Sequence, residues 1–592
     1  MRAVMEVLEP QAKYLSDLPP PLVQHFELMA TARCGVAKLR ELILTLGVRG
    51  KLVPQDPSDE PASELLEKIH SEKDRLIAQG KIKRGKPLAE IPQKEEPFSL
   101  PHGWAWVRLN SLLQKIGAGS TPLGGREVYV PNGVKFLRSQ NVWNDGLRLD
   151  SVAFIKPETH AKMNGTVVFA NDLLFNITGA SIGRCAVVPS NFDEANVSQH
   201  VTIVRTVMPE LNEFLHKVLI SRHVQQTVMD VQVGVSREGL SIAKLGQFLI
   251  PLPPLAEQSR IVSRVEELMG LCDALEAKGQ LEAAQHAQLV QTLLGALTAS
   301  TSPKELADNW QLVATHFDLL LDRPEAIDAL EQTILQLAVR GLLVPQDPKD
   351  EPASELLKKI RAEKDRLIAE GKIKRDKPVL PVEETEQAFE LPKGWDWVRM
   401  GNVVITSEAG WSPICIGSPR RKGYWGVLKV SAVSWGSFDA NANKELPSDL
   451  SPRPEYEVRS GDFLLSRANT EELVARSVVV GEVEPQLMLS DKIIRLDVSP
   501  LVNRHFLNLS NNSHHSRAHY AANASGTSSS MKNVSREVVL RTPIPLPPLA
   551  EQSRIVTRLE SLRRLCADLR QRLTARQTTQ AHLAEALIDE VA

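Results

Sequence analysis

A run of side chains with hydrogen-bonding ends occupies one short segment in the first half of the chain. Arg and Lys pair well with guanine in the major groove of DNA, whereas Gln and Asn pair well with adenine. Each good bidentate pair discriminates against the wrong base by about 1–3 kcal/mol. Because the run accompanies a β-prone segment, residues 134–137, it predicts a strand end that binds DNA. The members of this run are Lys135, Arg138, Ser139, Gln140 and Asn141.

The second half of the chain holds a more scattered set of the same kind. Two glycine-containing loops, residues 234–237 and 526–532, precede the last β-prone segment of each half and add one basic residue each. These loops are either turns that contact the DNA backbone or simply tight turns. Basic residues in such clusters contact phosphate more often than bases, so both kinds of contact stay open for every member. The predicted DNA-binding residues of these segments are Arg237, Arg420, Arg421, Lys422, Lys429, Arg467, Asn469 and Lys532.

Motifs for enzymatic chemistry are missing from the sequence. It contains no Gly-x-x-x-x-Gly-Lys-Ser/Thr phosphate loop and no Gly-x-Gly-x-x-Gly loop for a dinucleotide or S-adenosylmethionine. The Asn/Asp-Pro-Pro-Tyr/Phe motif with which amino-methyltransferases hold a flipped base is also missing. His514 and His515 have no Asp or Cys at ligand spacing, and the five cysteines form no Cys-x-x-Cys pair. We therefore predict no catalytic residue and no metal site in this chain.

Composition limits the class of protein. With 592 residues the chain is expected to hold several domains, because one hydrophobic core rarely grows past about 250–300 residues. Its net charge is −2, but residues 104–250 carry 14 Lys/Arg against 11 Asp/Glu and residues 395–543 carry 17 against 15. The positive charge of these two regions is a weak indication of nucleic-acid binding. The sequence has no apolar run of about 18 residues and opens with polar and charged residues, so we expect a cytoplasmic protein without a membrane span.

The elements that must position these residues occur twice. Residues 50–57 return as residues 341–348 after a shift of 291, and a Gly-Trp-x-Trp-Val segment returns with the same shift. The segment Pro-Leu-Pro-Pro-Leu-Ala-Glu-Gln-Ser-Arg-Ile-Val, which starts at Pro251, returns at Pro545 after a shift of 294. A period this long excludes a solenoid, whose repeats span roughly 20–50 residues. The chain therefore contains a duplicated frame.

Two inserts, residues 108–250 and 399–544, lie between the copies of the frame and share almost no sequence. Each contains short β-rich runs separated by Gly, Pro and Asn, and the first also contains one predicted helix, residues 213–229. Each insert is therefore expected to form a compact mixed α/β domain. Near-identical frames with different inserts indicate one scaffold function that is used twice and one recognition function that differs between the copies.

A long amphipathic helix is predicted after each Pro-Leu-Pro-Pro-Leu segment, because apolar residues follow at alternating steps of four and three. Cys272 and Cys566 lie on these stripes and are expected to be small buried hydrophobic residues. The simplest way to bury both stripes is to pair the two helices antiparallel, with the inserts at opposite ends. The predicted core residues are Ile261, Val265, Leu268 and Leu275, and Ile555, Leu559, Leu562 and Leu569, continued by Leu289, Leu293, Leu583 and Leu587.

These patterns predict a mixed α/β fold class and five parts of the chain. Two globular α/β recognition domains are separated by a long antiparallel helical coiled coil, and the duplication makes the whole pseudo-twofold. The parts are residues 1–100 (N-terminal helical region and linker), 101–250 (first recognition domain), 251–391 (coiled-coil helix, second frame helices and linker), 392–544 (second recognition domain) and 545–592 (C-terminal coiled-coil helix).

The duplicated Pro-Leu-Pro-Pro-Leu-Ala-Glu-Gln-Ser-Arg-Ile-Val segment, placed after a divergent insert and before a heptad helix, resembles the specificity subunits of type I restriction–modification enzymes. So does Gly-Trp-x-Trp-Val at the start of each insert, followed in the first by Gly119-Ser120-Thr121-Pro122. That turn has a weaker echo at Gly410-Trp411-Ser412-Pro413. The resemblance covers nearly the whole chain, except that residues 1–36 have no counterpart that we identify.

This resemblance implies a non-catalytic subunit that binds double-stranded DNA. Each insert would be a target recognition domain that reads one half of a split sequence, and the helical pair would set the gap between the halves. Two modification subunits would bind the frame, bring S-adenosylmethionine and methylate adenine at N6. Two restriction subunits would join them and bring ATP and Mg²⁺, so that this chain itself carries no cofactor.

Two other classes of protein remain as alternatives. A coiled-coil adaptor that binds proteins through its inserts would fit the near-neutral net charge, and it would show no salt-dependent binding to DNA. A single-chain modification enzyme would need the base-holding motif that this sequence does not contain.

Overall fold

The computed structural model describes residues 35–85, 89–122, 124–233, 239–300, 302–375, 379–434, 436–526 and 531–591. The chain divides into two compact units. Unit 1 comprises residues 1–282 and 576–592, and unit 2 comprises residues 283–575. Each unit holds one insert together with one copy of the frame, so each is described by itself.

The frame of unit 1 brings the two ends of its insert together. Strand β1 (Ala105–Arg108) pairs antiparallel with β13 (Leu249–Leu252), with Arg108 opposite Leu249. Two helices precede the insert, α4 (Gly35–Val48) and α5 (Ala62–Ala78), and the long helix α10 (Leu255–Ala299) follows it. The insert is therefore a domain whose entry and exit strands are neighbours.

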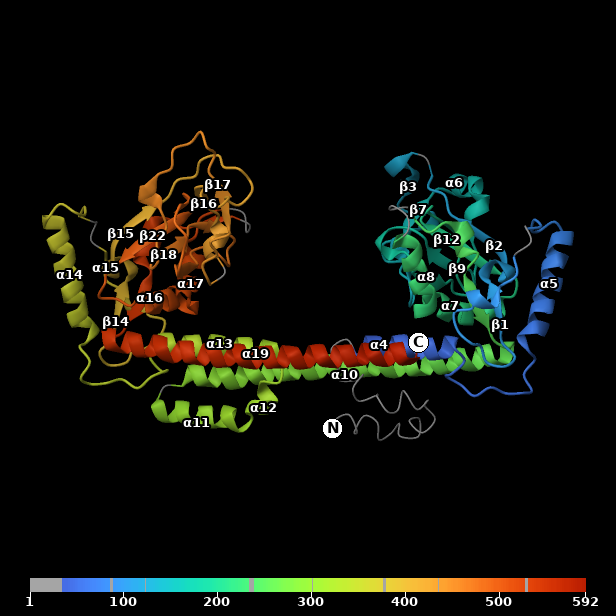
Figure 1. Ribbon diagram of the computed structural model, residues 1–592, viewed down its shortest axis with the longest axis horizontal. Coiled ribbons are helices and arrows are strands. Elements are labelled where there is room, and N and C mark those ends of the chain that lie inside the picture. Colours follow the sequence, from blue (N-terminus) through green and yellow to red (C-terminus); the bar gives the residue numbers. More distant parts are fainter. Residues whose placement is uncertain are drawn as a thin grey trace. The chain divides into compact units, whose positions relative to one another are not determined.

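Two sheets form the insert of unit 1, and helices α7 (Asn212–Ile220) and α8 (Arg222–Val233) pack beside the first sheet (Figure 1). Alternate residues of its central strand face different partners, because Leu173 and Phe175 join a core with α7 while Leu174 joins a core with the second sheet. The first sheet has the order β10 (Cys185–Val187), β9 (Leu173–Asn176), β12 (Val201–Thr206), β2 (Leu113–Ala118). The second has the order β3 (Tyr129–Val130), β7 (Ala153–Ile155), β4 (Val134–Leu137), β11 (Ala195–Val197), β8 (Val167–Val168).

The single helix predicted over residues 213–229 is wrong, because the structure has two helices there. Ser221 separates α7 from α8 with extended backbone angles, φ −73° and ψ 158°. Its hydroxyl donates a hydrogen bond to the carbonyl oxygen of Val218 and so replaces a helical interaction at the break. The apolar periodicity continues across this break and gives no sign of it.

Unit 2 repeats the architecture of unit 1 although the inserts share almost no sequence. Strand β14 (Asp396–Arg399) pairs with β24 (Pro543–Leu546), and helices α16 (Arg504–Asn512) and α17 (His514–Asn523) correspond to α7 and α8. The first sheet has the order β15 (Val404–Ala409), β22 (Ile493–Val498), β18 (Phe463–Ser466), β20 (Ser477–Val479), which is the order of β2, β12, β9, β10. The second sheet has the order β17 (Asn443–Glu445), β16 (Gly426–Leu428), β21 (Leu487–Met488).

The repeated residues of the frame make the same contacts in both units. Trp104 donates its indole N–H to the carboxylate of Glu257 at 2.9 Å, and Trp395 donates to Glu551 at 3.0 Å. We call this tryptophan–glutamate hydrogen bond the lock of each unit. Gly50, which lies against Trp104 in the lock of unit 1, has a positive φ of +67°. A Cβ atom there would lie 2.8 Å from the ring of Trp104, so a close approach requires glycine. The repeat in sequence is thus a repeat in side-chain packing.

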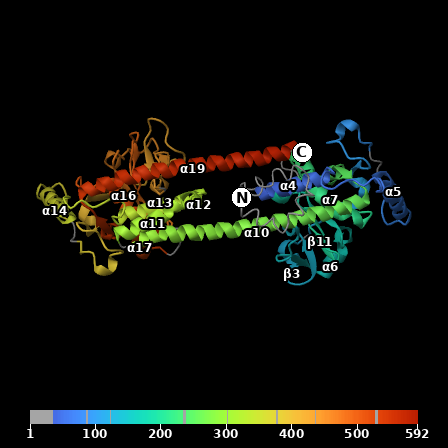
Figure 2. The same cartoon turned by 90° about the horizontal axis from the view of Figure 1, so that it is seen from below.

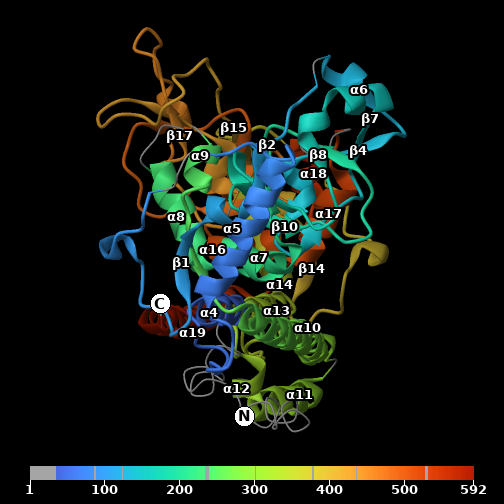
Figure 3. The same ribbon diagram turned by 90° about the vertical axis from the view of Figure 1, so that its right-hand side faces the viewer.

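A third helix shares the apolar stripe of each long helix. In unit 1, α4 lies beside α10 and also contacts α7 and α8 (Figures 2 and 3). A Cβ atom at Gly47 of α4 would lie 3.3 Å from the side chain of Ile261 and 3.4 Å from that of Val265. Ala584 and Ile588 of helix α19 (Leu549–Val591) belong to the same core. In unit 2, helix α13 (Pro324–Val339) packs with α19 and the last turns of α10 in the corresponding way.

The predicted stripe agrees with burial near the start of each long helix and is displaced farther along. Ile261, Val265 and Leu268 are buried and Leu275 is half-buried in α10; Ile555 and Leu559 are buried and Leu562 and Leu569 are half-buried in α19. Leu289 and Leu583 are exposed and Leu293 is half-buried, whereas the next residues, Val290, Ala584 and Leu294, are buried. A helix with 3.6 residues per turn drifts by about 20° per heptad, which accounts for the displacement by one position. The side chain of Leu587 lies outside the described residues.

Three further helices of the described chain belong to unit 2. Helix α14 (Ala353–Ala369) corresponds to α5, and α11 (Pro303–Thr315) and α12 (Phe317–Leu320) follow α10. Within the described part of the chain, no helix combines the length and apolar character needed to cross a bilayer.

Candidate nucleic-acid interface

The predicted DNA-binding run of unit 1 forms a tight turn, η5 (Ser139–Asn141), directly after β4. Asn141 is fully buried inside this turn. Its side-chain oxygen accepts the backbone N–H of Arg138 at 3.0 Å, and its amide group donates to the carbonyl oxygen of Arg148 at 2.8 Å. Asn141 therefore builds the turn in this conformation, and its polar groups are occupied within the protein.

The remaining residues of the turn face outward more freely. Asn176, at the end of β9, donates to the carbonyl oxygen of Ser139 at 2.8 Å and so fastens the turn to the first sheet. Gln140 is exposed and its amide lies 3.5 Å from the hydroxyl of Ser151. The guanidinium group of Arg138 donates to the backbone carbonyl oxygen of Ser151 at 3.4 Å. Long contacts at an exposed turn are ones that a ligand can replace.

Lys135 lies on β4 rather than in the turn. Its ammonium group is 2.6 Å from the carboxylate of Asp193, and that hydrogen bond lowers the pKa of the Asp193 carboxyl group. The ammonium group also lies 5.4 Å from the ring centroid of Phe192. The charge of Lys135 is thus already paired within the domain.

Unit 2 has a turn in the same place, η10 (Val430–Val433), directly after β16, and Lys429 precedes it as Arg138 precedes η5. Asn469 donates its amide to the hydroxyl of Ser434 at 2.8 Å, which ties the turn to the strand β19 (Ala468–Asn469). That strand pairs with β23 (Lys532–Asn533), where Lys532 is opposite Asn469. Arg467 directly precedes β19 and is exposed. The structure therefore brings Lys429, Arg467, Asn469 and Lys532 together.

The other basic residues predicted in unit 2 lie at the opposite end of β16. Arg421 forms a forked contact with the carboxylate of Glu445, with the shortest distance 2.7 Å, and this contact lowers the pKa of the Glu445 carboxyl group. Arg420 donates to the carbonyl oxygen of Pro485 at 2.5 Å and is mostly buried. Lys422 follows them and is exposed. These three residues do not join the cluster around the turn, and Arg237 lies outside the described residues.

The Gly-Ser-Thr-Pro turn of unit 1 and its weaker echo in unit 2 occupy the same place. Gly119 follows β2 and Gly410 follows β15, and the backbone of the residue after each donates to a neighbouring strand connection. A Cβ atom at Gly119 would lie 2.0 Å from the carbonyl oxygen of Val197, and one at Gly410 would lie 1.9 Å from that of Leu489. Close backbone contact thus requires glycine at both positions.

Several polar residues beside the turns were not predicted from the sequence. In unit 1, the hydroxyl of Thr178 lies 2.6 Å from a ring nitrogen of the exposed His200, one strand from the turn. Trp143 lies two residues after the end of η5, and the guanidinium groups of Arg148 and Arg184 lie over its ring. The position of Trp143 next to the turn was a visible signal, but its partner Arg184 is distant in sequence and is placed only by the fold.

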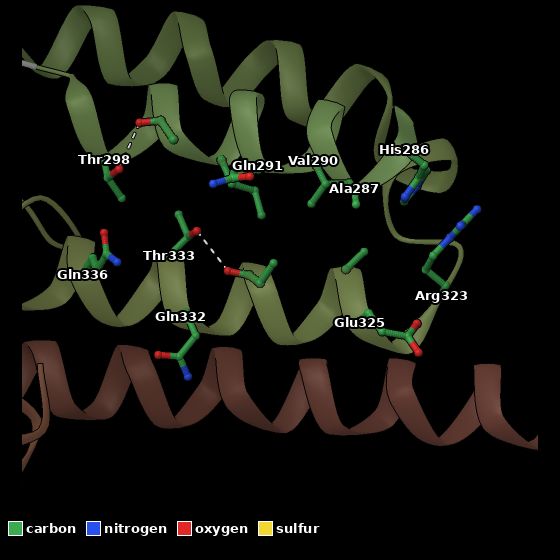
Figure 4. Close-up of a pocket in the computed structure, with 14 residues that line it drawn as sticks. His286, Ala287, Val290, Gln291, Thr298, Arg323, Glu325, Gln332, Thr333 and Gln336 are labelled. Carbon is green, nitrogen blue, oxygen red and sulfur yellow. Dashed lines mark hydrogen bonds between the residues drawn. The ribbon is translucent and has the colours of Figure 1, made fainter. Parts of the chain in front are cut away.

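A cavity of about 340 Å³ lies in the frame of unit 2, between the last turns of α10 and α13 (Figure 4). Its lining includes His286, Arg323 and Glu325 near one end and Thr298 and Gln336 near the other. Within the described ranges, no group of three or more His, Cys, Asp or Glu residues is arranged to hold a metal ion. Because α10 and α13 supply most of its lining, the cavity belongs to the helical frame and not to the cluster around the turn.

The sequence matches the family model described as the type I restriction modification DNA specificity domain over residues 101–285 and 455–576. It is 40% identical over 566 residues to the EcoEI specificity subunit of type I restriction enzymes from Escherichia coli, covering 94% of this chain and 93% of that one. It is 35% identical over 575 residues to the EcoAI specificity subunit from the same organism, with the same coverage. Among solved structures, the HsdS subunit from Thermoanaerobacter tengcongensis is similar with 19% identity, a TM-score of 0.40, and coverage of 84% of this chain and 98% of that chain.

Proposed function

The chain belongs to the specificity subunits of type I restriction–modification systems, and we propose that its two turns, η5 and η10, each read one half of a bipartite DNA sequence. The observation that carries this proposal is the equivalence of the two turns. They follow corresponding strands of corresponding sheets, yet they gather different side chains, Arg138 and Gln140 in one unit and Lys429 and Asn469 in the other. Equal scaffolds with unequal polar groups fit two readers of two different sequences.

We propose further that the duplicated frame binds two identical modification subunits. The lock between Trp104 and Glu257 in unit 1 recurs between Trp395 and Glu551 in unit 2, so the buried packing of the frame is repeated, which supports two equivalent binding sites. Modification subunits that carry S-adenosylmethionine and methylate adenine at N6 would supply the chemistry that this chain lacks. Restriction subunits with ATP and Mg²⁺ would join the same assembly. The five-part division of the chain, with recognition domains at residues 101–250 and 392–544, belongs to this proposal.

The long helices are proposed to set the unread gap between the two half-sites. Helix α10 begins in unit 1 and ends in unit 2, and α19 begins in unit 2 and ends in unit 1. An α-helix rises 1.5 Å per residue, so a change in the length of both helices would change a distance along DNA. The gap would then be a property of the helices and not of the recognition domains.

Salt-dependent binding separates this function from that of a protein-binding adaptor. The purified full-length chain should bind duplex DNA with an affinity that falls steeply as salt rises, because Lys and Arg displace counterions from phosphates. Exchanging the outward-facing groups, for example Gln140→Ala, should alter the preference for bases in one half-site only. Binding that is absent at low salt would contradict the reading function and favour the adaptor.

A further inference from the structure

Trp143 holds two arginine side chains beside the recognition turn of unit 1. The guanidinium carbon of Arg148 lies 4.2 Å from the centroid of the indole ring, and that of Arg184 lies 3.7 Å from it. Both distances are within the range of cation–π contact. Such contacts orient a planar guanidinium group while its N–H edges stay available to an acceptor. We name Trp143, Arg148 and Arg184 the arginine platform.

Hydrogen bonds fix the platform to the turn. The indole N–H of Trp143 donates to the carbonyl oxygen of Gln140 at 2.9 Å. The backbone N–H of Arg148 donates to the carbonyl oxygen of Asn141 at 2.9 Å, and the Asn141 side chain donates back to the Arg148 carbonyl. Strands β5 (Val142–Trp143) and β6 (Gly146–Leu147) pair between them. A displacement of the turn would therefore displace the platform with it.

A second set of contacts brings Arg184 to this place from a distant part of the sequence. The side-chain oxygen of Asn144 accepts the backbone N–H of Cys185 at 3.1 Å, so the β5–β6 hairpin is attached to the start of β10. Arg184 directly precedes that strand and follows Gly183, whose φ is +87°. The backbone is thus shaped to present Arg184 toward the hairpin.

The platform carries an excess of positive charge. Arg148 lies 3.0 Å from the carboxylate of Asp145, and both side chains are more than half exposed, so this ion pair is screened by solvent. Arg184 has no carboxylate within ion-pair distance among the described residues. Two guanidinium groups facing one exposed carboxylate leave a site that favours an additional anion.

Unit 2 has an arginine at the corresponding backbone position, and its side chain is partly buried and donates to the carbonyl oxygen of Glu472 at 3.4 Å. Arg476 takes the place of Arg184, because its carbonyl oxygen accepts the N–H of Ser466 at 2.9 Å just as that of Arg184 accepts the N–H of Asn176 at 2.8 Å. The preceding residue, Ala475, has a φ of +60°. That left-handed conformation is strained for alanine. Unit 2 nevertheless keeps the positive φ that unit 1 has at Gly183.

We propose that the arginine platform binds a phosphate of the DNA backbone next to the base pairs read by the turn. This inference rests on the proposed function of η5 and names a further contact of the same site. A guanidinium group matches a phosphate with two parallel N–H···O bonds, and phosphate contacts fix the register of a protein on the duplex without reading sequence. The platform would thereby position Ser139 and Gln140 against the base edges.

The test compares full-length variants by their affinity for duplex DNA across a range of salt concentrations. Arg184→Gln and Arg148→Gln should each weaken binding roughly tenfold at low salt, because a charge-assisted contact is lost. Each should also reduce the slope of log K against log salt by about 0.9. The loss should be equal for a duplex with the target sequence and for an unrelated duplex. Trp143→Leu should act in the same direction, and Trp143→Phe should restore much of the affinity.

Arg75→Gln is the matched control, since Arg75 is an exposed arginine on α5 whose partner is Glu72. It should leave the affinity and the salt slope unchanged. If the wild-type chain shows no salt-dependent binding, the proposed function itself fails. If the wild type binds and neither Arg184→Gln nor Arg148→Gln changes affinity or slope, the platform is wrong. A change in base preference without a change in slope would also overturn it, because the arginines would then read bases. Inorganic phosphate that competes with DNA equally well for the wild type and for Arg184→Gln would contradict a phosphate site at the platform.

Discussion

A buried carboxylate holds together distant segments of the frame in unit 2. Glu551 is 1% exposed and accepts hydrogen bonds from Trp395 at 3.0 Å and from Gln346 at 3.2 Å. All three residues belong to the repeated segments of the frame. The contacts join residues more than 150 positions apart, so they form only when the chain folds.

Replacing the buried carboxylate should destabilise unit 2. Glu551→Ala would leave the buried indole N–H of Trp395 unsatisfied, at a cost of about 1–3 kcal/mol. Denaturant unfolding followed by tryptophan fluorescence should show a lower midpoint. Glu560→Ala, on the exposed side of the same helix, is the control and should leave the midpoint unchanged. Equal midpoints for the two variants would contradict the structural role of the lock.

Stability should fall in mild acid because of buried histidines. Burial lowers the pKa of His515 to about 4, and the neighbouring His514 and His519 contribute to this shift. The folded pKa lies below the unfolded one, so the stabilisation is present above about pH 6.5 and is lost as pH falls toward 4. Between pH 7.5 and pH 5 the loss from His515 is roughly 2 kcal/mol.

Melting temperatures at these two pH values measure the effect. His515→Gln should narrow the difference between them, whereas His70→Gln, at an exposed position of α5, should not. An unchanged difference in His515→Gln would show that this histidine does not contribute to the acid sensitivity.

Between elements, the ion pair that joins the short helix to the long helix has opposite polarity in the two units. Arg40 of α4 lies 2.5 Å from Asp273 and 3.2 Å from Glu276 of α10. In unit 2, Arg570 of α19 lies 3.1 Å from Glu331 of α13. With the shifts of 291 and 294, Arg40 corresponds to Glu331 and Glu276 corresponds to Arg570. Arg40 of α4 therefore attracts Glu276 of α10 and would repel Arg570 of α19. Glu331 of α13 attracts Arg570 and would repel Glu276.

A charge-reversal series tests this pairing. Arg40→Glu should destabilise unit 1 by about 1 kcal/mol, since an exposed ion pair is lost and like charges face each other. Adding Glu276→Arg should recover part of the stability, because it restores the Glu–Arg pair that unit 2 has at these two positions, while Asp273 stays beside residue 40. Denaturant midpoints of the two single variants, the double variant and the wild type give the coupling energy. Additive effects of the two changes would contradict a direct interaction.

Elements with strong local patterns were predicted well, and tertiary detail was not. The β-prone segment predicted at residues 134–137 is β4, and α10 and α19 begin at the last residue of the Pro-Leu-Pro-Pro-Leu segments, close to where long helices were predicted. The break at Ser221 and the displaced stripe at Val290 escaped prediction, because both depend on what packs against the helix. The place of η5 after β4 was predictable, but the burial of Asn141 in it was not, because its partner is the backbone of Arg148.

At the scale of the whole molecule, the duplication extends farther toward the N-terminus than the sequence patterns first indicated. His25-Phe26-Glu27-Leu28 matches His316-Phe317-Asp318-Leu319 at the same shift of 291. The second segment includes most of α12 in unit 2, whereas the first lies outside the described residues.

The proposed gap-setting role of the long helices has a direct consequence. Seven residues added to both α10 and α19, after Leu275 and after the equivalent Leu569, would lengthen each helix by roughly 10 Å. Because B-DNA rises 3.4 Å per base pair, the gap in the recognised sequence should widen by about three base pairs. Mapping methylated sites in cells that also hold the modification partners should show unchanged half-sites. An unchanged gap with full methylation would contradict the role of the helices.

If each unit reads its own half of the target, an insert exchange within the chain should duplicate one half-site. Residues 109–248 are replaced by residues 400–542, so that the β1–β13 pair and the β14–β24 pair both carry the second insert. Methylated sequences are then mapped genome-wide with the modification partners present. The exchanged chain should direct methylation to two inverted copies of the half-site read by unit 2. A target that keeps the half-site read by unit 1 would show that the inserts do not carry the reading function.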